Sequence, residues 1–174
     1  MSKVTFYSCI TSFLLLLSGC GGGASNAVPL PTNTAVVLSA ALAPGRTQTS
    51  SPIKEIDVIF VLPQAATPIL DPTKTDGSLL IGETGLKNLN LNGFILAGSF
   101  NSSTREVRFS LLPNDIVTTD LGTGDIARLT CSISSGAQLS AQDIHPTYGG
   151  FGPGSVDLST EIIPSVSIVT YQKP

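Results

Sequence analysis

Residues 105–111 read Arg-Glu-Val-Arg-Phe-Ser-Leu, and every second side chain from position 107 onward is apolar. Val107, Phe109 and Leu111 share one face of an extended chain, and the polar side chains between them share the other. Successive side chains of a β-strand point to opposite faces of its sheet, so this alternation predicts a strand with one buried face. The preceding Asn101-Ser102-Ser103-Thr104 is rich in turn formers and predicts a hairpin leading into that strand.

A second strand is expected within 54–62, where the chain reads Ile56-Asp57-Val58-Ile59-Phe60-Val61-Leu62 before Pro63. The even-numbered positions from 56 to 62 are all apolar, which predicts a core-facing side. Ile59 and Val61 make the opposite side apolar as well, so we expect this strand to be covered on both faces.

The rest of the chain divides into further short apolar runs, separated by turns rich in Gly, Pro, Asn and Asp. No helical period of useful length interrupts them. Some eight short strands with such turns predict an all-β protein, a single β-sandwich domain over residues 35–174. We expect residues 63–78 to form a turn-rich connection and 82–93 a loop or a short helical turn. The expected strands are 35–42, 54–62, 79–81, 94–100, 105–111, 126–134, 137–144 and 162–171, with Pro164 at a bulge or a sheet edge.

Residues 1–19 have the parts of a secretory signal peptide: Lys3 near the start, an apolar run, and then small residues. The apolar run from Val4 to Leu17 has 14 residues, fewer than the roughly 20 that span a bilayer. It closes with Leu17-Ser18-Gly19-Cys20, which resembles the lipobox of bacterial lipoprotein precursors. The resemblance implies cleavage between Gly19 and Cys20 and acyl chains on Cys20. The alternative is an ordinary signal peptide with a chance cysteine.

The small, uncharged and Pro-containing residues 20–34 predict a flexible tether that follows the lipidated Cys20. Two or three acyl chains hold a protein stably on a bilayer, whereas one chain binds it only reversibly. The expected location is therefore the bacterial cell envelope, with the membrane as a partner through the N-terminal acyl chains. By resemblance to lipoprotein sorting, Gly21 favours the outer over the inner membrane.

The stretch from Ile53 to Ile168 resembles a cohesin-type sandwich, the jelly-roll-like fold shared with some carbohydrate-binding modules. The resemblance rests on the strands at 56–62 and 105–111, on the turn and strand at 124–133, and on the late Gly-rich hairpin before Val166. It implies a domain that binds a partner module or supports surface assembly through a face of one sheet.

Composition excludes several functions. The formal net charge is −3 and no basic run occurs, which argues against nucleic-acid binding. Of the three cysteines, the lipobox resemblance implies that Cys9 leaves with the signal and that Cys20 is lipidated, which would leave Cys131 without a disulfide partner in the mature chain. Because Cys131 alternates with apolar residues, we expect a buried thiol.

No catalytic motif and no cofactor site is expected. His145 is the only histidine, it lies in a predicted loop, and no Gly-x-Ser-x-Gly elbow is present. The His and Cys residues are too few for a zinc site, and no metal site is assigned. The pairs Asp71 with Asp76 and Asp120 with Asp125 are the nearest approach to calcium ligands, although Asp is common in plain turns.

The unusual segment 145–154 holds Tyr148 and Phe151 in a Gly/Pro-rich frame. Because Tyr and Phe often anchor interfaces, Tyr148 and Phe151 are candidates for a recognition loop. The alternative, which we favour, is a hairpin whose aromatics fold back on the core. The sequence as a whole predicts an envelope lipoprotein with a non-catalytic domain for protein binding or structural assembly. The alternative is a lipid-anchored carbohydrate-binding module, which the lack of Trp disfavours.

Overall fold

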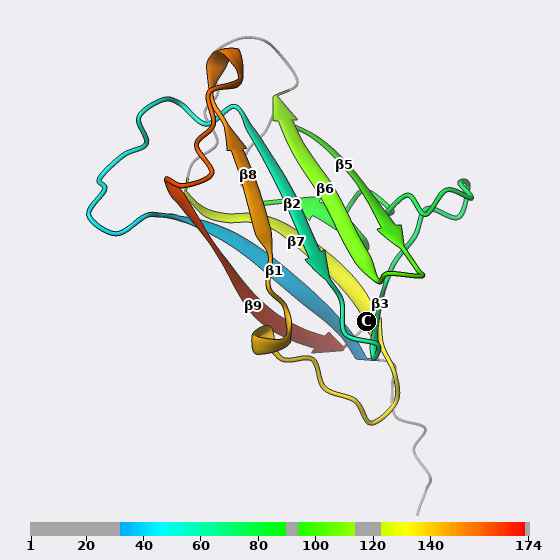
Figure 1. The fold of residues 1–174 in the computed structure, drawn as a ribbon. Coiled ribbons are helices and arrows are strands. Elements are labelled where there is room, and N and C mark those ends of the chain that lie inside the picture. The colour runs from blue at the N-terminus through cyan, green and yellow to red at the C-terminus, as the bar shows by residue number, and fades with distance from the viewer. Residues whose placement is uncertain (1–31, 90–93, 114–122, 173–174) are drawn as a thin grey trace, which may run out of the picture.

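A computed structural model describes residues 32–89, 94–113 and 123–172, and these form nine β-strands and two short 3-10 helices (Figure 1). The strands are β1 (Thr32–Leu42), β2 (Glu55–Val61), β3 (Ala66–Pro68), β4 (Leu86–Asn88), β5 (Phe94–Asn101), β6 (Glu106–Pro113), β7 (Gly124–Ile133), β8 (Thr147–Phe151) and β9 (Ile162–Gln172). The 3-10 helices are η1 (Ala141–Asp143) and η2 (Pro153–Ser155).

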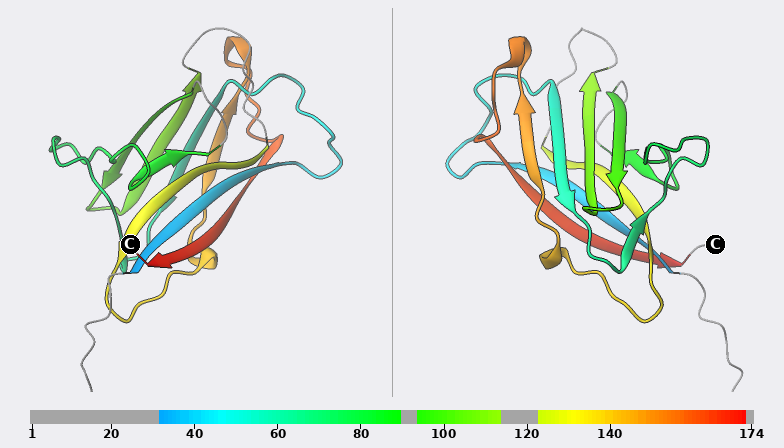
Figure 2. Two further views of the ribbon diagram at one scale, coloured as in Figure 1. Left: turned by 180° about the vertical axis from the view of Figure 1, so that it is seen from behind. Right: turned by 45° about the vertical axis from the view of Figure 1, so that its right-hand side comes forward.

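The strands form two antiparallel sheets that pack face to face, which confirms the predicted all-β sandwich (Figure 2). Sheet A has the order β3-β7-β1-β9, and β4 pairs with β7 beside β3. Sheet B has the order β5-β6-β2-β8. Only β5 and β6 are joined by a tight hairpin, so most pairings bring together strands that lie far apart in the sequence.

One core fills the space between the sheets, and strand alternation supplies its side chains. The predicted inward face of β6 is confirmed, because Val107, Phe109 and Leu111 are all buried. Each of the three lies opposite a buried residue of β2 in the antiparallel register, with the pairs Phe60↔Val107, Val58↔Phe109 and Ile56↔Leu111.

The prediction that the second strand is covered on both faces is wrong. Ile59 is only half-buried and Val61 is 55% exposed, although both lie in an interior strand of sheet B. In the described part of the chain, no further layer packs on the outer side of sheet B (Figures 1 and 2). The apolar residues on that side therefore face solvent.

Sheet A buries both sides of its central strands. Ala35 and Val37 of β1 point away from the core, yet both are buried. They lie opposite Thr130 and Arg128 of β7, and Thr130 is buried as well. β1 begins at Thr32, three residues before the predicted start of the domain, so residues 32–34 belong to the sheet and not to a tether. Thr34 is itself buried.

The predicted hairpin at 101–104 is confirmed, and Asn101 stabilises it by accepting hydrogen bonds from two backbone amides of the turn. Arg105 follows with a left-handed φ of 59°. Its guanidinium group donates to the backbone oxygens of Leu62, Pro63 and Ala66. The side chain thereby ties the β5–β6 hairpin to the connection between β2 and β3.

Four segments named here differ from the prediction in type. Residues 79–81 make only isolated bridges, and β4 lies in the stretch 82–93, for which no strand was expected. Residues 137–144 contain η1 instead of a strand, because the Ser140 side chain accepts from the Gln142 amide and caps a 3-10 turn. Residues 147–151 are a strand and not a loop.

Candidate functional site

The outer face of sheet B is the clearest candidate for a binding surface. Alternation places two transverse rows of side chains on it. One row runs Ala97–Ser110–Asp57–Gly149 across β5, β6, β2 and β8. The next row runs Ser99–Arg108–Ile59–Thr147. We call these two rows, together with Val61, the sheet B face.

Small side chains make the middle of this face concave. Four positions of the face have short side chains or none, and the longer side chains beside them rise further above the sheet. These four are Ala97, Ser99, Ser110 and Gly149. The result is an open groove of about 440 Å³ over β5, β6 and β2. Its lining residues are Asp57, Val58, Ile59, Ala97, Gly98, Ser99, Arg108, Phe109 and Ser110.

Both signs of charge border the groove. Asp57 accepts a hydrogen bond from the Ser110 hydroxyl across the β2–β6 pair, which fixes the carboxylate on the face. Arg108 is 62% exposed and forms an ion pair with Glu106 on its own strand, so its guanidinium group remains accessible. Partial burial and then the negative charge of Asp57 raise the pKa of Glu55, two residues before Asp57 on β2.

A second depression of about 280 Å³ adjoins the groove at Ile59. Its walls are Ile59, Phe60 and Val61 of β2 on one side and the segment that leads into β8 on the other. His145 lies in that segment and is exposed, as expected for a surface histidine. The face thus combines an apolar stripe along β2 with a charged groove beside it.

The predicted recognition residues do not lie together. Tyr148 points inward and is 5% exposed, and its hydroxyl donates to the backbone oxygen of Ser39 at 3.1 Å. Burial raises the pKa of Tyr148 well above its usual value. Tyr148 therefore supports the core and is not available for contact, which corrects the prediction for this residue and fits the alternative of an aromatic folded back on the core.

Phe151 lies on the opposite side of β8 and is half-buried. An ideal Cβ at Gly149 would lie 3.2 Å from the Phe151 ring and 3.6 Å from the Asp57 Cβ, so the ring covers this glycine at the edge of the sheet B face. Phe151 is thus the one predicted recognition residue that stays beside the groove.

Sequence reasoning missed the groove itself. The alternation at 105–111 already placed Glu106, Arg108 and Ser110 on one exposed side. What was lacking is the strand order, which sets these residues beside Asp57 and Ile59 about fifty positions earlier in the chain.

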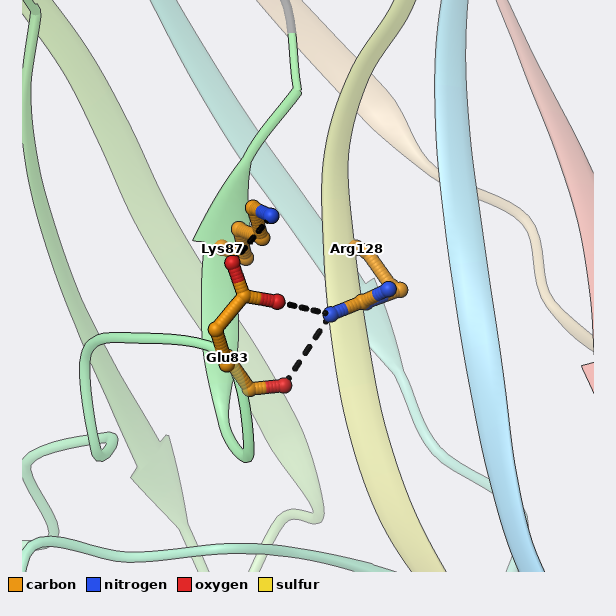
Figure 3. Close-up of polar contacts among 3 residues, drawn as sticks. All are labelled: Glu83, Lys87 and Arg128. Atoms are coloured by element: carbon orange, nitrogen blue, oxygen red, sulfur yellow. Dashed lines mark hydrogen bonds and ion pairs between the residues drawn. The ribbon is translucent and has the colours of Figure 1, made fainter. Parts of the chain in front are cut away.

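A second polar cluster ties sheet A together (Figure 3). Glu83 forms ion pairs with Lys87 of β4 and with Arg128 of β7, the latter at 3.0 Å. The same Arg128 nitrogen also donates to the Glu83 backbone oxygen at 3.0 Å. The cluster fastens the loop before β4 to the central strand of the sheet, and this accounts for its charges without a ligand.

The candidate calcium ligands serve as turn caps. Asp71 accepts hydrogen bonds from the amide and hydroxyl of Thr73, and Asp76 accepts the same pair of bonds from Ser78. Asp125 accepts from the Ser39 hydroxyl, and Asp120 lies outside the described residues. Within the described ranges, no three His, Cys, Asp or Glu side chains gather as a metal site would require.

Cys131 is fully buried in the core, which confirms the expected buried thiol. Burial raises the pKa of its thiol to about 12, and the nearby Arg105 opposes this only in part.

The predicted anchor residues Gly19 and Cys20 lie outside the described residues. Among residues 32–89, 94–113 and 123–172, no helix is long and apolar enough to cross a membrane. No protein-family model, no curated protein and no solved structure matches this chain. The fold and its open sheet face are therefore the basis for a functional proposal.

Proposed function

We propose that this chain is a bacterial envelope lipoprotein whose non-catalytic β-sandwich binds a protein partner through the sheet B face. Acyl chains on Cys20, exposed by cleavage after Gly19, anchor the protein. Cys20 and the first residue of β1, Thr32, are twelve positions apart. Twelve residues reach at most about 40 Å when fully extended, so the domain stays close to the membrane that holds it.

The observation that carries the proposal is the apolar stripe of half-buried Ile59 and exposed Val61 on an interior strand, with the charges of Asp57 and Arg108 beside it. Protein interfaces commonly combine an apolar centre with a polar rim, and arginine is enriched in them. The groove is open and shallow, a shape that suits a protein surface better than a small enclosed ligand.

The binding test uses the full chain and two matched variants as bait to capture proteins from bacterial envelope membranes. Val61→Lys places a charge on the apolar stripe, and Val156→Lys makes the same change at a site of similar exposure in the loop after η2. We expect the wild type and Val156→Lys to retain a partner protein that Val61→Lys loses. Direct binding of the purified partner to the three proteins should show the same difference in affinity. Equal retention by all three proteins would refute the role of this face.

The anchor has its own test. Metabolic labelling with a fatty-acid probe should mark the wild-type chain and not Cys20→Ser. Labelling that survives this substitution would refute the lipoprotein assignment and leave the binding result unaffected.

One observation favours the alternative, a carbohydrate-binding function of the same face. The Phe151 ring lies over Gly149 beside the Asp57 carboxylate, and sugars are commonly bound by an aromatic ring together with polar side chains. In a glycan array, binding that is lost in Phe151→Ala and kept in Tyr148→Phe would favour this alternative. Binding to no glycan would leave the protein-binding proposal in place.

A further inference from the structure

Three of the four long sides of this sandwich are closed against further strand pairing. The outer edge of β5 is covered by residues 77–80, since the Leu79 amide donates to Gly98 and the Phe100 amide donates to Gly77. The outer edge of β8 is covered by the turn after it, where the Leu158 amide donates to Gly150 at 2.7 Å. The edge beyond β7 is made of β3 and β4, which have three residues each.

The fourth side is β9, an edge strand of eleven residues that pairs only with β1. Among the described residues, no backbone hydrogen bond joins β9 to a segment other than β1, although β8 and η1 lie near it. Figures 1 and 2 show β9 next to β1 at the side of sheet A. An antiparallel strand paired on one side leaves alternate amide and carbonyl groups free on the other, and these groups form a template for another strand.

The composition of β9 lacks the usual protection of an edge. The strand Ile162–Gln172 contains no charged side chain, whereas natural edges are commonly guarded by Lys or by other charges. Pro164 lies near its start and removes one donor there, which leaves the remainder of the strand suited to pairing. Val169 is 49% exposed, and Val166 and Ile168 are only partly buried at the rim of the core.

We propose that two copies of this chain associate through β9, pairing it antiparallel with its counterpart and continuing sheet A across a two-fold axis. A second copy fits this edge because an antiparallel strand is complementary to itself, as an isologous interface requires. No like charges oppose one another in such a pair, since the strand carries none. The added strand covers Val166 and Ile168 and satisfies the free backbone groups of both copies. This association is independent of the anchor and of the sheet B face.

The test measures the mass of the full chain, purified in mild detergent, by light scattering coupled to gel filtration. Val169→Lys introduces on this edge the kind of charge with which natural edge strands prevent further pairing. It changes a residue that is already half exposed, so the monomer should keep its fold. Val61→Lys is the matched control, with 55% exposure on the other sheet. We expect the wild type and Val61→Lys to be dimers, and self-association of Val169→Lys to be weaker by about tenfold or more.

A cross-link locates the contact. In a chain that carries Cys9→Ser and Cys20→Ser, Ser167→Cys on β9 should form a disulfide-linked dimer under mild oxidation. Ser132→Cys, at an exposed position of the interior strand β7, should not. A monomeric wild type, a dimer that Val61→Lys disrupts while Val169→Lys does not, or cross-linking at 132 and not at 167 would each overturn the proposal.

Discussion

Arg105 links the β5–β6 hairpin to the connection between β2 and β3, and its substitution tests how much this link stabilises the domain. Its Nε atom donates to the Leu62 oxygen at 3.1 Å, and one terminal nitrogen donates to Pro63 at 2.9 Å and to Ala66. The guanidinium carbon lies 5.6 Å from the centroid of the Phe100 ring, within cation–π range. A single side chain thus binds three carbonyl groups, and of these the Pro63 oxygen also accepts from the Ala66 amide.

The expected loss of stability on removing the Arg105 side chain follows from these contacts. A hydrogen bond from a charged donor contributes about 1.5–3 kcal/mol, but the half-buried side chain lets water replace part of what is lost. We expect Arg105→Ala to lower the free energy of unfolding by about 2–4 kcal/mol. Arg105→Lys keeps the charge but not the planar fork, so it should recover only part of that loss.

The backbone supplies an internal check. Arg105 has a φ of 59°, and a left-handed conformation costs a non-glycine residue about 1–2 kcal/mol. Arg105→Gly removes the same side chain and relieves this strain, so it should be more stable than Arg105→Ala by about 1 kcal/mol.

Urea denaturation followed by circular dichroism measures all three variants, and Arg108→Ala serves as the exposed arginine control with little expected change. A wild-type urea midpoint for Arg105→Ala would refute the stabilising role of these hydrogen bonds. A glycine variant less stable than the alanine variant would refute the strain assigned to the backbone of residue 105.

Three further predictions concern packing and ionisation. Gly98→Ala should lower the free energy of unfolding by about 1–3 kcal/mol in a urea titration. The added Cβ would lie 2.9 Å from the Phe109 Cβ and from two leucine methyl groups of the core. An unchanged urea midpoint would contradict this packing. Cys131 should resist a thiol reagent at pH 8 until urea unfolds the chain, since a pKa of about 12 leaves only about one thiol in ten thousand ionised; rapid labelling of the folded protein would show that the site is not closed. The hydrogen bonds from Ser50 lower the pKa of Glu161 below its usual 4.5, so their stabilisation is complete above that pH and is lost as the pH falls through the lowered value. The melting temperature of Glu161→Gln should therefore lie below that of the wild type at pH 7 and approach it in acid, and a gap that widens in acid would reverse the sign.

The candidate site could be predicted only in part. The exposed side of residues 105–111 followed from alternation, as did the burial of Cys131, because both depend on a local period of two. Tyr148 and Phe151 look like a pair in the sequence because both are aromatic and lie close together. The structure separates them, because residues an odd number apart on one strand point to opposite faces, and neither Gly nor Pro prevents that strand from forming.

The sequence by itself determined the all-β class, the positions of most strands and the edge position of Pro164, since propensity, alternation and turn chemistry act within a few residues. Only the tertiary structure decided which strands lie side by side and which faces stay open. Ile59 and Val61 look like core residues in the sequence, and they reach solvent because no described segment covers sheet B on that side. Likewise β9 becomes an open edge because, among the described strands, it pairs with β1 alone. Strand order depends on contacts between distant residues, and local patterns do not encode it.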